Sequence, residues 1–141
     1  MAMKTLYTTT VTTTGGREGR VRSADGVLDL PVALPKELGG KGVTATNPEQ
    51  LFAAGYAACF ESAVLHLARA AKVDVKESSV TATVGIGPSD TGGFGLSVKL
   101  VVKLVGVERE FAQRLVDDAH AKVCPYSNAT RGNVPVDVSL A

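Results

Sequence analysis

Several residue types and patterns that mark common protein classes are scarce or missing in this chain of 141 residues. It has no tryptophan, and aromatic residues make up only 5% of it, so its core must rest mainly on valine, leucine and alanine. No apolar run reaches the ~18 residues of a membrane span, so a membrane protein is not expected. The net charge is +1 and the lysines and arginines are scattered, so nucleic acid is not expected as a partner either.

Metal-ligating residues are equally few. The chain has only two histidines, His66 and His120, and they lie far from one another in the sequence. We therefore expect no metal site, no bound cofactor and no Cys–His nucleophile.

The two cysteines, Cys59 and Cys124, are far apart in the sequence, so no Cys-x-x-Cys motif joins them. The first residues lack the zones of a secretory signal, which favours a cytoplasmic location. Lasting disulfides are rare in that reducing compartment, and cysteine pairs there tend to be catalytic or redox-sensing. If the fold brings the two thiols together, the pair points to peroxide or disulfide chemistry.

The pattern along the chain predicts a single domain, residues 1–141, of the α+β class, because no repeat or linker divides it. Helices should lie on one side of antiparallel sheet. The expected elements are strands at 5–14, 20–23 and 27–30, a long loop at 31–46, a helix from 47 to about 71, a hairpin of strands at 79–87 and 95–105, a helix at 108–122 and a strand at 134–140.

The first of these helices has a clear beginning. Asn47 suits its cap, Pro48 its first position and Gln50 a capping box. Its predicted apolar stripe consists of Leu51, Ala54, Ala58, Leu65 and Ala68. One small domain has difficulty covering so apolar a helix on all faces, so a homodimer is expected.

Each cysteine has two interpretations. Burial of Cys59 among small apolar residues would raise its pKa, so it is either a small core residue or a nucleophile with a cationic neighbour. Cys124 precedes Pro125, which suits the start of a new helix, where free amide groups favour a thiolate; otherwise Cys124 is incidental to a turn.

Two charged residues are candidates for activating a thiol. Arg17, flanked by glycines, is either a solvated loop residue or a guanidinium that lowers a thiol pKa and orients a peroxide oxygen. Glu49 either compensates the helix dipole or fixes an arginine by bidentate pairing.

Two long motifs carry a resemblance to a known family. Residues 47–60 are NPEQLFAAGYAACF and residues 123–133 are VCPYSNATRGN. With these motifs, residues 15–17 and the closing strand, essentially the whole chain resembles the organic hydroperoxide resistance (Ohr) branch of the OsmC/Ohr family. The second motif is similar to Ohr rather than to its OsmC sister, and no motif position departs from the pattern.

The resemblance implies a fold and an activity. The fold would be OsmC-like, with antiparallel sheets packed around two main helices in an intertwined homodimer that has two active sites at the subunit interface. The activity would be that of a thiol-dependent peroxidase that reduces alkyl and fatty-acid hydroperoxides to alcohols. Lipoylated proteins or dihydrolipoamide would be the reductant.

The resemblance also implies roles for four residues. Cys59 would be the peroxidatic thiolate that becomes a sulfenic acid, and Cys124 the resolving thiol that forms a disulfide with it. Arg17 and Glu49 would form the polar network that activates Cys59. In one straight helix, however, Glu49 lies ~15 Å along the axis from Cys59. We therefore expect a bend near Gly55 with Arg17 as the bridge, the alternatives being a bridge without a bend or a contribution from the partner subunit.

Two other functions use the same cysteines. A thiol-based peroxide sensor would become oxidised and signal to a partner, although no DNA-binding helix or basic stripe is evident. A secreted structural protein with one disulfide is disfavoured by the missing signal. For the peroxidase, an apolar substrate pocket is expected near Cys59, walled by Tyr56, Phe60, Leu34, Leu38 and Val43.

Overall fold

The computed structural model describes residues 3–141. The chain forms two compact units, Met1–Leu51 and Phe52–Ala141, which we call the N-terminal and C-terminal units, and each contains its own sheet. The boundary between them falls inside one helix, so no linker separates them in the sequence.

The N-terminal unit is built on an antiparallel three-stranded sheet of β1 (Val11–Thr14), β2 (Arg20–Ser23) and β3 (Asp29–Pro31), in that order. A short 3₁₀ turn, η1 (Gly16–Glu18), joins β1 to β2, and another, η2 (Lys36–Leu38), lies in the predicted loop. β1 is shorter than expected because β2, its partner, has only four residues to pair with it.

Helix α1 (Pro48–Ala70) begins as the sequence predicts. The Asn47 side-chain oxygen accepts a hydrogen bond of 2.8 Å from the backbone N–H of Gln50. The Gln50 side chain accepts from Thr46 Oγ1, 2.9 Å away, so the capping box is only half formed. The predicted bend at Gly55 is wrong, because α1 continues through this residue. Gly55 instead makes room: a Cβ there would lie 3.1 Å from the Tyr126 hydroxyl.

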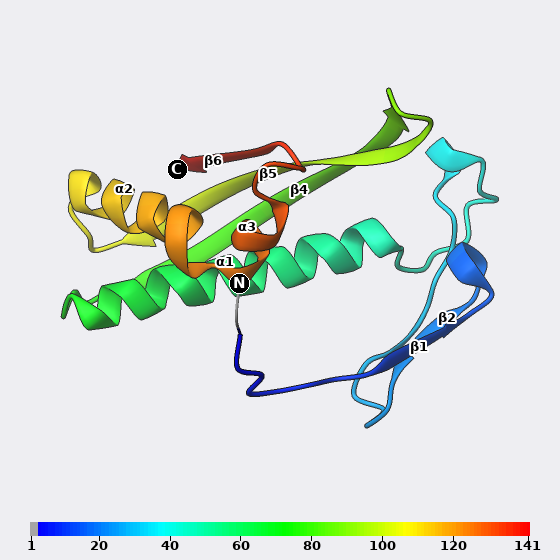
Figure 1. The fold of residues 1–141 in the computed structure, drawn as a ribbon, viewed down its shortest axis with the longest axis horizontal. Coiled ribbons are helices and arrows are strands. Elements are labelled where there is room, and N and C mark those ends of the chain that lie inside the picture. The colour runs from blue at the N-terminus through cyan, green and yellow to red at the C-terminus, as the bar shows by residue number, and fades with distance from the viewer. Residues whose placement is uncertain (1–2) are drawn as a thin grey trace. The chain divides into compact units, whose positions relative to one another are not determined.

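The C-terminal unit contains the predicted hairpin in longer form, β4 (Glu77–Ser89) and β5 (Gly93–Val105), with α1 running alongside it (Figure 1). The last strand, β6 (Val136–Leu140), pairs with β5 in parallel, so this sheet is mixed and the expectation of antiparallel sheet is wrong for that pair. The reason is the connection: helices lie between β5 and β6, and such a crossover returns the chain in the same direction.

That helical connection has three parts. Glu108 caps α2 (Arg109–Asp118) by accepting hydrogen bonds from the N–H groups of Glu110 and Phe111. The predicted helix at 108–122 does not continue regularly, because Ala119–Val123 form a π-helical turn, η3. The short helix α3 (Pro125–Thr130) then follows Cys124, which is its N-cap, as predicted.

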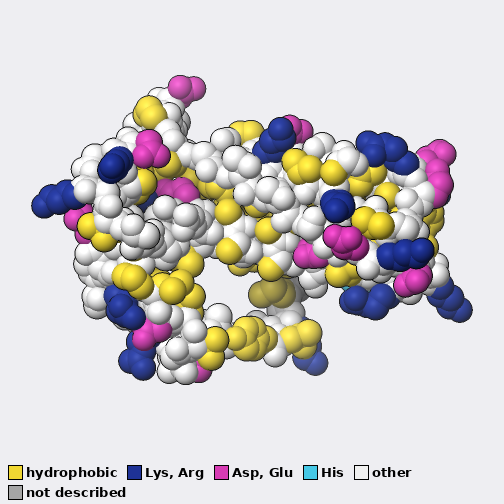
Figure 2. All heavy atoms as spheres, turned by 180° about the vertical axis from the view of Figure 1, so that it is seen from behind, with side chains coloured by type: hydrophobic (Ala, Val, Ile, Leu, Met, Phe, Trp, Pro, Cys, Tyr) yellow, Lys and Arg dark blue, Asp and Glu magenta, His cyan; other side chains and the backbone are white. Residues whose placement is uncertain are grey.

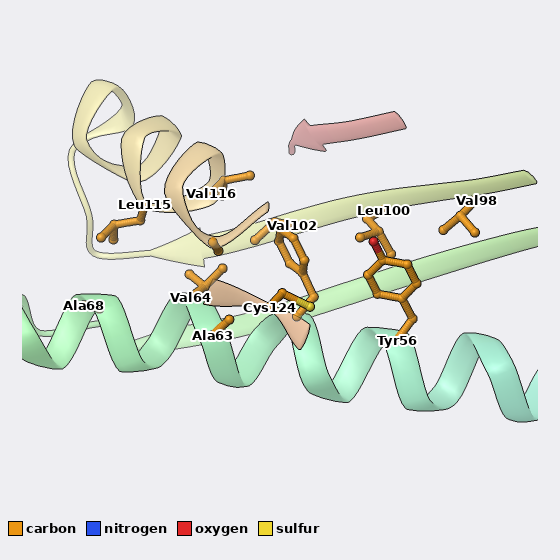
Figure 3. Packing of buried hydrophobic residues seen from close by; sticks show 12 residues of the cluster. Tyr56, Ala63, Val64, Ala68, Val98, Leu100, Val102, Leu115, Val116 and Cys124 are labelled. Carbon is orange, nitrogen blue, oxygen red and sulfur yellow. The ribbon is translucent and has the colours of Figure 1, made fainter. Parts of the chain in front are cut away.

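The core of the C-terminal unit lies between α1, β5 and α2. Tyr56 and Val64 extend from α1 toward Leu100 and Val102 of β5, and Val116 comes from α2 (Figure 3). All five side chains are fully buried.

The buried face of α1 differs from the predicted stripe. It consists of Tyr56, Phe60, Ala63, Val64 and Ala68, of which only Ala68 was expected, while Ala54 and Ala58 are exposed in the single chain. The face with the larger side chains packs on the sheet because it buries more apolar surface.

By length and composition alone, α1 meets the criteria for a membrane span, contrary to the sequence expectation. A core helix meets the same criteria, and α1 packs on a sheet, so this is weak evidence for a membrane.

The surface of α1 is largely uncovered in the single chain. Only 28% of its most apolar 18-residue stretch is buried, which fits the predicted homodimer. Basic and acidic side chains alternate over the face in Figure 2 without a continuous basic area.

Candidate active site

The fold brings the two cysteines together. The sulfurs of Cys59, in the middle of α1, and Cys124, at the start of α3, lie 3.7 Å apart and are hydrogen-bonded. Both are free thiols, Cys124 fully buried and Cys59 partly exposed. A reactant from solvent therefore meets Cys59 first, with Cys124 directly behind it.

The π-helical turn positions Cys124. The backbone N–H of Cys124 donates to the carbonyl of Ala119, five residues earlier, over 2.8 Å. The Arg131 guanidinium closes this turn from the other side, donating to the carbonyl of His120 over 2.6 Å and to the side chain of Asn128 over 3.0 Å. Pro125 begins α3 directly afterwards. The backbone on both sides of the buried thiol is therefore held by hydrogen bonds.

The surroundings of Cys59 do not by themselves favour a thiolate. Burial raises the pKa of the Cys59 thiol, a backbone hydrogen bond from Tyr126 partly offsets this, and the neighbouring Cys124 raises the pKa further. The sequence predicts that free amides at the start of α3 stabilise a thiolate at Cys124. In the structure, one of these amides, that of Tyr126, instead lowers the pKa of Cys59. The net direction is upward, so an anionic Cys59 needs a positive charge beyond these groups.

Arg17 and Glu49 pair within the N-terminal unit. Nη1 of Arg17 donates to Oε2 of Glu49 over 2.9 Å and lies 2.8 Å from Oε1. The Oε1 contact lacks hydrogen-bond geometry, so Oε1 is a buried carboxylate oxygen without a donor among the described residues. The predicted pairing is confirmed, although a single guanidinium nitrogen makes it rather than the two-pronged fork.

Glu49 and Cys59 lie on the same uninterrupted helix. Ten residues of α-helix correspond to an axial rise of ~15 Å, so the two side chains do not share a turn. Without the bend at Gly55, the two remaining routes from Glu49 to the thiol, through Arg17 or through a partner subunit, stay predictions.

Two of the residues expected to line an apolar pocket beside Cys59 do not line one. Tyr56 and Phe60 are completely buried in the core and cannot line an open pocket. A groove in the C-terminal unit lies instead at the turn of the hairpin, between residues that include Ile86, Phe94 and Val134, and neither cysteine lines it. Among residues 3–141, no three His, Cys, Asp or Glu side chains are grouped as metal ligands.

Comparison with known proteins places this arrangement in a family. The model of the OsmC-like protein family matches residues 39–139. An organic hydroperoxide resistance protein of Xanthomonas axonopodis is 52% identical over 139 residues, covering 98% of this chain and 96% of that protein. The chain belongs to the OsmC/Ohr family.

Solved structures of the OsmC/Ohr family agree with this fold over the whole chain. An organic hydroperoxide resistance protein from Elizabethkingia anophelis, with thiocyanate bound, is 53% identical, has a TM-score of 0.94 and covers 99% of each chain. A Vibrio cholerae structure with captopril bound in one of its active sites is 57% identical, with a TM-score of 0.93, covering 99% of this chain and 95% of that one.

In this OsmC/Ohr chain, the sequence did not indicate a polar cluster beside the thiols. The hydroxyl of Tyr56 lies 2.8 Å from that of Ser127, which lies 2.8 Å from Nδ1 of His120. His120, which the sequence predicts to be neither a metal ligand nor part of a Cys–His nucleophile, belongs to this cluster. Tyr56 precedes Cys59 by one helical turn and Ser127 follows Cys124 by the same number of residues, and this symmetric spacing is the signal that could have revealed the contact.

Proposed function

We propose that this protein is a thiol peroxidase that reduces organic hydroperoxides to alcohols. The observation that carries the proposal is the pair of free thiols 3.7 Å apart, one partly exposed and the other buried behind it. The names of the matched relatives, organic hydroperoxide resistance proteins, support the same substrate class.

In the first step the Cys59 thiolate attacks the outer oxygen of the hydroperoxide. The O–O bond breaks, the alkoxide leaves and takes up a proton to become the alcohol, and Cys59 becomes a sulfenic acid. The partial exposure of Cys59 supports this assignment, because the substrate arrives from solvent.

In the second step the sulfur of Cys124 attacks the sulfenic sulfur of Cys59. The S–S bond forms, the S–O bond breaks, and hydroxide leaves as water after taking a proton. A dithiol reductant then restores both thiols by exchange. We assign this role to lipoyl-type dithiols of a lipoylated protein or dihydrolipoamide, in a reducing cytoplasm.

Activation of Cys59 is assigned to the Arg17–Glu49 pair. The pKa of Cys59 is raised by burial, so a guanidinium that approaches the sulfur would favour the thiolate. Glu49 holds one nitrogen of Arg17 and leaves the other guanidinium donors for the substrate. We further propose a homodimer, in which the uncovered face of α1 becomes buried.

Steady-state turnover tests the function. The assay compares dihydrolipoamide, glutathione and thioredoxin as reductants, with cumene hydroperoxide and hydrogen peroxide as substrates. We expect many turnovers with dihydrolipoamide and few with the others. An alkyl group gains roughly 0.8 kcal/mol per buried CH₂, so hydrogen peroxide should have a kcat/KM about a hundredfold lower, equivalent to ~2.7 kcal/mol.

The Cys59→Ser variant is the matched control, since a serine hydroxyl is too poorly ionised to attack the O–O bond. Turnover by folded Cys59→Ser would contradict the assignment. A thiol-based sensor, the alternative, would consume one equivalent of hydroperoxide and stop.

A further inference from the structure

A buried hydrogen-bond chain joins the helix that carries Cys59 to the helix that Cys124 begins. It consists of the Tyr56 hydroxyl, the Ser127 hydroxyl and Nδ1 of His120, with both contacts at 2.8 Å. Thr130 adds a longer contact of 3.3 Å to Tyr56, and its hydroxyl donates to the Ser127 carbonyl over 3.2 Å. Tyr56 and Ser127 are fully buried, so water does not replace the bond between their hydroxyls.

This chain stands one helical turn away from the two thiols. Tyr56 lies three residues before Cys59 on α1, and Ser127 lies three residues after Cys124 on α3. Two cross-contacts therefore run side by side between the same helices: hydroxyl to hydroxyl at 2.8 Å and sulfur to sulfur at 3.7 Å. The first contact is directional and restricts α3 to a small range of positions relative to Cys59.

His120, the third residue of the hydrogen-bond chain, restrains the backbone that precedes Cys124. His120 belongs to the π-helical turn that precedes Cys124, whereas Ser127 follows it. Its ring also packs near Phe60 of α1, with 6.2 Å between the ring centres. The backbone before and after the buried thiol is thereby tied to one hydroxyl, that of Ser127.

We propose that Tyr56, Ser127 and His120 are positioning residues for the resolving thiol, and that they set the rate at which Cys124 closes the disulfide. The inference rests on the proposed peroxidase function. A disulfide needs the sulfurs at about 2.05 Å, so Cys124 must approach Cys59 from 3.7 Å along one direction. Without the hydroxyl contact α3 samples more positions, and fewer of them place the sulfur on that line.

The experiment separates the two chemical steps in full-length Ser127→Ala and Tyr56→Phe. One equivalent of cumene hydroperoxide is added, sulfenic acid is trapped with dimedone in quenched samples, and disulfide formation is followed by intact mass as the loss of two hydrogens. We expect sulfenic acid formation within about twofold of wild type and disulfide formation slowed about tenfold or more, with added oxygens appearing at higher peroxide. A loss of one buried hydrogen bond, ~1.4 kcal/mol, corresponds to such a factor.

Ser78→Ala is the matched control, since it removes a hydroxyl that donates to Glu61 on α1 in the same unit. It should leave both rates unchanged. Tyr56→Phe keeps the buried ring and decides the matter if Ser127→Ala does not fold. Disulfide formation at the wild-type rate in the variants, or an equal slowing of both steps, would overturn the positioning role.

Diamide distinguishes failure of this inference from failure of the proposed function. It oxidises two thiols to a disulfide and is itself reduced to a hydrazine, so no hydroperoxide is required. The same slowing is expected in Ser127→Ala and Tyr56→Phe. Wild-type protein in which cumene hydroperoxide produces neither sulfenic acid nor disulfide would overturn the peroxidase function, while slowed closure with diamide would still support positioning.

Discussion

Oxidation of the two thiols should raise the stability of the fold by a large amount. The bond would join residues 65 positions apart, a long loop for a small protein. In the chain-entropy model, closing a loop of this length in the unfolded state stabilises the native state by ~4 kcal/mol at 25 °C. A protein of this size gains about 3 °C in Tm per kcal/mol, so oxidation should raise Tm by ~12 °C.

The measurement is a calorimetric scan of the same preparation after treatment with one equivalent of cumene hydroperoxide and after full reduction with dithiothreitol. Intact mass must first show the loss of two hydrogens, so that the oxidised sample is known to contain the disulfide. Cys124→Ser is the control, because its oxidised form adds oxygen to Cys59 without closing a loop. Its Tm should not rise.

A disulfide that forms quantitatively without a rise in Tm would refute the reasoning. It would mean that closing the gap between the sulfurs strains α3 or α1 by as much as the loop closure contributes. The positions of the two sulfurs, 3.7 Å apart, would then be unfavourable for a disulfide. The Cys59–Cys124 contact would no longer support the proposed second step.

Three further outcomes are expected. Arg17→Ala should raise the kinetic pKa of Cys59, each unit corresponding to ~1.4 kcal/mol of thiolate stabilisation; an unchanged pH–rate profile would assign the charge to another cation. Burial and Arg131 lower the pKa of His120 from its ordinary 6.5, opposed by Asp117, so the unfolded chain binds more protons and the free energy of unfolding falls as pH drops below about 6.5. His120→Gln should remove that slope in urea titrations from pH 7.5 to 5, and an equal slope in the variant would contradict it. Light scattering at micromolar concentration should give the mass of a dimer, whereas a stable monomer would exclude the proposed burial of α1.

Local signals in the sequence predicted the elements whose causes are local. Asn47 caps α1 because its side chain reaches an amide three residues away, and Cys124 begins α3 because proline follows it. The glycine-rich segment between β4 and β5 likewise ends both strands where a turn is required. The start of each helix and the end of each strand depend here on a few neighbouring residues, so the local sequence is sufficient to predict them.

Features that depend on a distant partner could not be predicted in the same way. Glycine often marks a break in a helix, and this is why the sequence predicts a bend at Gly55. In the structure, the missing side chain of Gly55 instead leaves room for the ring of Tyr126 to pack against α1. The buried face of α1 depends on β5, and the Tyr56–Ser127 contact joins residues 71 positions apart. At the site, the sequence predicted the Arg17–Glu49 pairing and singled out the two cysteines, and both contacts are present. The hydroxyl groups beside the thiols could be found only from the packed helices.

The π-helical turn makes the number of residues before Cys124 as important as their identity. Each residue of a regular helix turns the chain by about 100° and advances it by 1.5 Å, and a π turn holds one residue more than an α turn. If the same residues 119–123 wound as an ordinary α-helix, Cys124 would be turned by roughly a quarter turn away from Cys59. The extra residue of the π turn therefore sets the direction in which the chain leaves α2, and with it the position of Cys124 against Cys59.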